Sequence, residues 1–112
     1  MSTIQQDRIT EKSKKISISE SSPGTFRRRD VSSVLICNLA STEAVVSLYM
    51  SETSKGDPVT SNLLVYKHTI DPEDTWYWKS TDGLRLPSGY SLFLELDTSS
   101  TSEDVVTTVI LE

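Results

Sequence analysis

Few residues of this chain could carry out catalysis. His68 is the only histidine and Cys37 the only cysteine. A zinc site needs three or four Cys, His or carboxylate ligands at a recognisable spacing, and nucleophilic catalysis needs a nucleophile beside a base. His68 alternates with Tyr66 and Ile70, a pattern typical of a packed strand residue. The sequence therefore predicts a protein that is not an enzyme and has neither a metal site nor a cofactor.

An acidic segment contains the remaining candidate metal ligands. Asp71, Glu73, Asp74 and Asp82 could in principle bind calcium, but their spacing matches no EF-hand loop. Asp71-Pro72-Glu73-Asp74 is more typical of a solvated turn, in which proline fixes one backbone dihedral angle. The four glycines are isolated from one another, so no glycine-rich phosphate-binding loop is expected.

Charge is distributed unevenly along the chain. Residues 1–30 hold seven basic and four acidic side chains, whereas residues 31–112 hold four basic and twelve acidic ones. Such a basic segment could bind an acidic surface on a copy of this chain, on another protein or on nucleic acid, or it could be a solvated terminus. Arg27, Arg28 and Arg29 could bind phosphate groups, but only this segment is basic and the rest would repel a polyanion. We therefore do not expect nucleic-acid binding.

Trp76, Tyr77 and Trp78 form an aromatic segment with two interpretations. They could form a stacking platform that binds carbohydrate. More often, two tryptophans on one face of a strand anchor a core or an interface. We favour the second interpretation and count Trp76 and Trp78 among the candidate partner-binding residues.

Strand-like runs separated by turn residues fill most of the chain. We expect strands at residues 14–20, Val31–Asn38, Val45–Ser51, Leu63–Ile70, Thr75–Lys79, Tyr90–Leu96 and Val105–Leu111. This pattern predicts an all-β protein: one antiparallel β-sandwich of about seven strands, either jelly-roll or immunoglobulin-like. Residues 1–24 would be a polar, basic arm with an edge strand at 14–20, and residues 25–112 the sandwich.

The run Val34-Leu35-Ile36-Cys37 is apolar on both faces of its expected strand. We expect such a strand to lie inside two packed sheets, with Cys37 as a buried, inert thiol. A single cysteine excludes an intramolecular disulfide, and no apolar stretch approaches the length of about 20 residues that spans a bilayer. The N-terminus lacks the apolar region of a signal peptide, so we expect the protein in the cytoplasm and not in a membrane.

Several segments resemble a known group of proteins. They are Ile36-Cys37-Asn38, Val46-Ser47-Leu48-Tyr49, Asp71-Pro72-Glu73-Asp74-Thr75, Gly83-Leu84-Arg85-Leu86-Pro87-Ser88-Gly89-Tyr90-Ser91-Leu92 and the strand Val105–Leu111. The sequence resembles, over residues 25–112, the small all-β virion structural proteins of tailed bacteriophages, especially those of marine and cyanobacterial phages.

This resemblance implies a non-enzymatic virion structural protein, assembled in the host cytoplasm. The expected role is a capsid decoration or cement subunit that binds the major capsid protein and forms homo-oligomers. A neck, tail or fibre-attachment subunit is the alternative within the same class, and a carbohydrate-binding β-sandwich module is the alternative from another class. The arm could add a strand to a neighbouring subunit. The candidate partner-binding residues are Ile16, Ile18, Arg27, Arg28, Arg29, Trp76 and Trp78.

Overall fold

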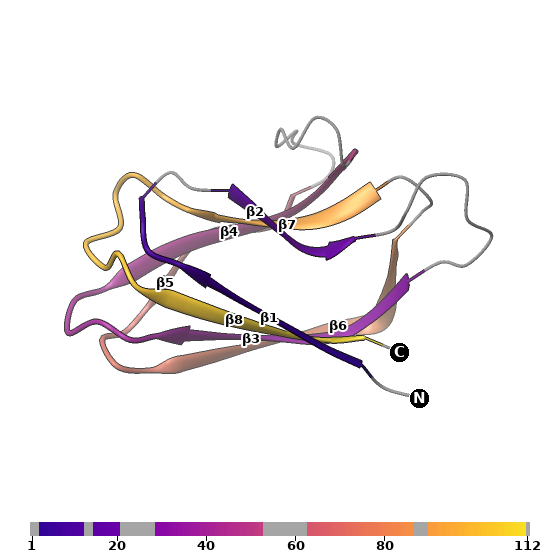
Figure 1. Cartoon of the computed structure of the whole chain (residues 1–112), viewed down its shortest axis with the longest axis horizontal. Helices are drawn as coiled ribbons and strands as arrows, with labels where there is room; N and C mark the ends of the chain where they lie inside the picture. The colour runs from indigo at the N-terminus through magenta and orange to yellow at the C-terminus, as the bar shows by residue number, and fades with distance from the viewer. Residues whose placement is uncertain (1–2, 13–14, 21–28, 53–62, 87–89, 112) are drawn as a thin grey trace.

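The computed structural model describes residues 3–12, 15–20, 29–52, 63–86 and 90–111 of the chain. These residues form eight β-strands and no helix (Figure 1). The strands are β1 (Thr3–Ile9), β2 (Lys15–Glu20), β3 (Arg29–Asn38), β4 (Ala44–Glu52), β5 (Leu63–Ile70), β6 (Thr75–Leu86), β7 (Tyr90–Leu96) and β8 (Val105–Leu111). The expected all-β fold is confirmed.

The strands form two four-stranded antiparallel sheets that pack face to face (Figure 1). Sheet 1 has the order β1-β8-β3-β6 and sheet 2 the order β2-β7-β4-β5. Four of the strand pairs nest inside one another as in one long folded hairpin: β1·β8, β2·β7, β3·β6 and β4·β5. Two more pairs, β3·β8 and β4·β7, join neighbouring parts of this hairpin, so that it forms two sheets. This is a jelly roll, so the first of the two expected sandwich types is correct.

The core lies between the two sheets because most of the strands turn an apolar face toward the opposite sheet. In β7, Leu92, Leu94 and Leu96 are fully buried, as the period-two pattern predicts. Each such leucine stabilises the fold by about 1.5–3 kcal/mol. The core cluster comprises Ile9, Val31, Val34, Ile36, Ala44, Val46, Leu48, Ile70, Leu86, Leu92, Leu94, Leu96, Val105 and Val109.

The N-terminal segment differs from the expected arm. Residues 3–9 form β1, which pairs with β8 from Thr3 to Ile9, and the Ile9 side chain is only 1% exposed. An edge strand can be held by main-chain hydrogen bonds and a single core residue. Because β1 has few apolar residues, its sequence did not predict a strand. The expected edge strand at 14–20 is present as β2 over Lys15–Glu20, and it pairs with β7 of this same chain.

β6 is longer than expected and continues to Leu86 instead of ending at Lys79. Its register with β3 shifts, because Ser33 lies opposite Lys79 whereas Val31 lies opposite Leu84. An irregularity of this kind accommodates extra residues in one strand of an antiparallel pair. The polar segment 80–83, which resembles a loop in sequence, therefore lies within the strand.

Candidate interaction surface

The outer face of sheet 1 carries an unusual number of apolar side chains. Along β8, Val105, Thr107 and Val109 are buried, so Val106 and Ile110 point outward and are partly exposed. The same alternation places Leu35 and Cys37 of β3 on the outer face. We call this surface the sheet-1 face; it comprises Ile4, Gln6, Arg8, Leu35, Cys37, Thr75, Tyr77, Lys79, Val106, Thr108 and Ile110.

Strand register brings these apolar residues together across all four strands. Leu35 lies between Tyr77 on β6 and Thr108 on β8. Ile110 lies beside Ile4 of β1, the outermost strand on the other side. The Ile4 and Tyr77 side chains are 66% and 54% exposed. The patch is therefore continuous, which is typical of a surface that binds another molecule.

The residues that make up the sheet-1 face include two cations, Arg8 and Lys79, and no carboxylate; Arg85, farther along β6 and opposite Asp30 of β3, is a third exposed cation on this side of the sheet. Arg8 pairs with Asp104, which precedes β8, through Nε to Oδ1 and Nη2 to Oδ2, both at 2.8 Å. The hydrogen bond and charge of Arg8 lower the pKa of the Asp104 carboxyl, and Asp104 in turn raises the pKa of Arg8. Within the described part of the chain, no ion pair involves Lys79.

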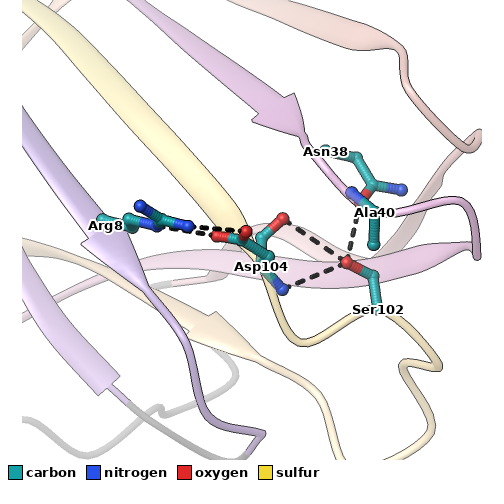
Figure 2. A network of polar contacts seen from close by, with 5 residues as sticks. All are labelled: Arg8, Asn38, Ala40, Ser102 and Asp104. Carbon is teal, nitrogen blue, oxygen red and sulfur yellow. Dashed lines mark hydrogen bonds and ion pairs between the residues drawn. The ribbon is translucent and has the colours of Figure 1, made fainter.

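A polar network borders this face at one end of the sandwich (Figure 2). The Asp104 backbone N–H donates to the Ser102 hydroxyl oxygen at 3.3 Å, and that hydroxyl donates to Oδ1 of Asn38 at 2.7 Å. The Ala40 N–H donates to the same Asn38 oxygen at 3.2 Å. The network links the Arg8 ion pair on β1 to the buried side chain of Asn38, at the end of the sandwich where the loops meet.

Asn38 is the centre of this network and is only 2% exposed. Its amide nitrogen lies 2.7 Å, 3.3 Å and 3.2 Å from the carbonyl oxygens of Thr42, Ile70 and Asp71. One side chain therefore holds together the loops β3–β4, β5–β6 and β7–β8. Buried polar groups with all partners in place fix a single arrangement of the chain.

The loops at this end carry most of the described carboxylates. The β3–β4 and β7–β8 loops lie together at the left of Figure 1. Lys12 is the only cation among the described residues of the four loops at this end, beside eight acids. We call these residues the acidic end; its acids are Glu11, Glu43, Asp71, Glu73, Asp74, Asp97, Glu103 and Asp104.

The expected acidic turn is confirmed, and no ligand cluster was found around it. Asp71, Glu73 and Asp74 are exposed, and Glu73 adopts a left-handed conformation with φ of 57°. The Asp82 side chain lies outside the described residues. Among the side chains that the structure describes, no group of three or more His, Cys, Asp or Glu is arranged to hold a metal ion.

Cys37 is not the buried core thiol that the sequence predicted. It is partly exposed on the sheet-1 face, with Sγ 2.9 Å from the Thr75 hydroxyl oxygen. A shallow hollow of about 210 Å³ lies beside it, lined by Cys37, Asn38, Leu39, Glu73, Asp74 and Thr75. The prediction failed because β3 is apolar on both faces although only one face meets the second sheet.

The two tryptophans point toward the interior. Trp76 and Trp78 are half-buried and pack against the core, while Tyr77 between them points outward. The Trp76 ring stacks on His68 of β5, with ring centroids 3.9 Å apart and planes 23° from parallel. His68 is therefore a packed strand residue, as expected. The pair joins β6 of sheet 1 to β5 of sheet 2 along one open side of the sandwich.

The structure does not describe the side chains of the other predicted partner-binding residues. Ile16 and Ile18 belong to β2 in sheet 2, and their side chains lie outside the described residues. Arg27 and Arg28 also lie outside them, whereas Arg29 begins β3 with a side chain that is not described. We did not predict the sheet-1 face from the sequence. Its signal was present, because Leu35, Val106 and Ile110 follow or precede inward apolar residues, so their strands are apolar on both faces.

The comparisons with known proteins assign no family. No family model matches this sequence, and no well-characterised protein matches it significantly. A search of the described residues for a long apolar helix that could cross a membrane gave none.

Proposed function

We propose that this chain is a non-enzymatic structural subunit of a bacteriophage virion, most simply a decoration or cement subunit that binds the major capsid protein. The observation that carries the proposal is the sheet-1 face, which is apolar across four strands and partly exposed. A patch of this kind suits a protein that works when covered by another chain.

Two further observations support the proposal. The eight-stranded jelly roll is an architecture of viral capsid domains, although it also occurs in lectins and cupins. Two of the segments that resemble small phage virion proteins lie on a strand and a turn of this sandwich: Val46–Tyr49 on β4 and Asp71–Thr75 at the β5–β6 turn. Because a fold alone does not determine function, the test must be made on particles.

The test is to purify the particles produced by the phage or prophage that encodes this chain and to count the chain by quantitative mass spectrometry against the major capsid protein. Hundreds of copies per particle are expected for a decoration subunit. A count near six or twelve would contradict decoration and favour the neck or tail. Absence from density-purified particles would refute the virion role.

The carbohydrate-binding alternative is not carried by the geometry. A platform built from residues 76–78 needs exposed indole faces, but Trp76 and Trp78 pack against the core and Trp76 stacks on His68. Only Tyr77 of the three is largely exposed. We therefore make no proposal of sugar binding, and glycan-array binding lost on Tyr77→Ala would reopen the question.

A further inference from the structure

We propose that the hollow beside Cys37 receives a basic side chain of the protein that covers the sheet-1 face, an arginine or a lysine that projects from an apolar surface. The inference rests on the proposed function, because it names the chemistry by which the partner is recognised. It concerns the place where the sheet-1 face meets the acidic end, and the position, rigidity and charge of the hollow carry it.

The hollow is continuous with the sheet-1 face. Cys37 and Thr75, whose Sγ and hydroxyl oxygen lie 2.9 Å apart, belong to the face and also line the hollow. Its volume of about 210 Å³ lies below the roughly 300–1,000 Å³ of sites that hold small molecules. The hollow therefore suits a single long side chain, and a partner that covers this end of the face also covers the hollow.

Main-chain hydrogen bonds between two loops hold the walls of the hollow in place. The Asn38 N–H donates to the Asp74 carbonyl oxygen at 2.9 Å, and the Glu73 N–H donates to the Ala40 carbonyl oxygen at 3.1 Å. The Asn38 side chain adds a hydrogen bond from its amide nitrogen to the carbonyl oxygen of Asp71 at 3.2 Å. The hollow is therefore formed before a partner binds, so little conformational entropy is lost when a side chain enters it.

The lining of the hollow combines apolar and acidic groups. Leu39, whose side chain is 50% exposed, and Cys37 provide apolar contacts, while Glu73 and Asp74 provide two carboxylates. Oδ1 of Asp74 accepts the Thr75 N–H at 2.9 Å, which fixes the position of this carboxylate. Among the residues that the structure describes, no cation lines the hollow and no ion pair involves either carboxylate. A lysine or arginine matches this lining, because its aliphatic stem packs on apolar groups while its head carries the charge.

Covering the sheet-1 face makes a cation necessary at this point. Glu73 and Asp74 are exposed in the free chain, and a surface that packs on Cys37 and Thr75 removes water from one side of their carboxylates. A carboxylate that loses water without gaining a partner costs free energy. A basic side chain of the partner offsets this cost, and it fixes the orientation in which the two proteins meet.

The experiment is co-sedimentation of the purified full chain with phage heads that lack it, at about 0.15 M sodium chloride. Glu73→Gln combined with Asp74→Asn should weaken binding about tenfold, because it removes both charges and keeps the size of both side chains. The matched control combines Glu11→Gln with Glu43→Gln, which removes two exposed carboxylates of the acidic end that do not line the hollow. Circular dichroism and thermal melts confirm that both double variants fold.

Two further measurements follow the hollow directly. Binding of the wild-type chain and of the control should weaken as sodium chloride is raised from about 0.05 to 0.5 M, whereas the Glu73/Asp74 variant should respond less, because salt screens the ion pair in the hollow. Cys37 is the only cysteine, so its alkylation by iodoacetamide reports on the hollow alone. Mass spectrometry should show slower alkylation of the bound chain than of the free chain.

Failure of this inference can be told apart from failure of the proposed function. If the wild-type chain does not bind the heads, the decoration role is contradicted and this inference with it. If the wild-type chain binds and the Glu73/Asp74 variant binds as well as the control, the inference is overturned and the decoration role stands. The same holds if Cys37 of the bound chain reacts as fast as Cys37 of the free chain.

Discussion

The hydroxyl of Ser102 donates a 2.7 Å hydrogen bond to Oδ1 of Asn38, although 64 residues separate the two in the chain. Ser102 is fully buried in the β7–β8 loop and Asn38 ends β3, so the bond joins the end of the third strand to the loop before the last strand. Asp104, two residues beyond Ser102, carries the ion pair to Arg8. The geometry of the acidic end therefore depends on this contact.

Asn38→Ala should lower the free energy of unfolding by about 3 kcal/mol, because it leaves Ser102 and several loop carbonyls buried without their partner. Urea denaturation followed by tryptophan fluorescence measures the change. Ser41→Ala, at an exposed position of the same loop, is the matched control and should be close to neutral. Equal effects of the two substitutions would show that Asn38 does not hold the loops together.

Arg8→Gln should lower the melting temperature near neutral pH, and the difference from the wild-type protein should disappear as the pH falls. The pKa of Asp104 in the folded chain lies below its ordinary value of 3.8 because Arg8 stabilises the carboxylate. A depressed pKa contributes stability above the unfolded value, and this contribution is lost as pH falls through the folded pKa. Melts between pH 7 and pH 2.5 test this.

The control for the ion pair is Lys12→Gln. Lys12 Nζ lies 3.9 Å from Glu103 Oε1, which is a longer contact than that of Arg8 and one to a more exposed carboxylate. Exposed pairs of this kind contribute little to stability, so we expect no resolved change in melting temperature. A difference between Arg8→Gln and wild type that does not shrink as the pH falls below 3.8 toward 2.5 would mean that Arg8 acts through packing and not through Asp104.

Trp78→Ala should destabilise the fold by about 2 kcal/mol, because the partly buried indole packs against the core. Tyr77→Ala, at the next position on the outward face, should change stability by less than about 0.5 kcal/mol. Denaturant midpoints of the two variants give the comparison. The reverse order would show that the tryptophans, and not Tyr77, face outward.

His68→Ala should cost about 1 kcal/mol, because it removes the stacking partner of Trp76 across the open side of the sandwich. His68→Phe should restore most of the loss, since the contact requires a flat ring. Thr69→Ala, at the exposed neighbouring position, serves as control. Trp76 fluorescence should change in His68→Ala; a destabilisation that Phe does not rescue would point to a polar role for the imidazole.

Much of the fold was determined by local sequence. The recurrence of leucine at every second position, Leu92, Leu94 and Leu96, specifies β7 by itself, and the bounds of β5, β7 and β8 agree with those predicted. Asp71-Pro72-Glu73-Asp74 likewise specifies its turn, because proline and short polar side chains fix the backbone locally. The sandwich class followed from strand number and turn spacing.

Only the tertiary structure decided how the strands share the core. β1 is a strand because β8 supplies main-chain partners from the far end of the chain, and no local pattern contains that information. The same holds for Asn38 and Ser102, whose hydrogen bond exists only after the loops meet. The two-sided apolar pattern of β3 was correctly recognised in the sequence, but a strand cannot show which of its faces meets a sheet of its own chain. The structure places Val34 and Ile36 inside and leaves Leu35 and Cys37 on the sheet-1 face, because the jelly roll closes only one side of each sheet.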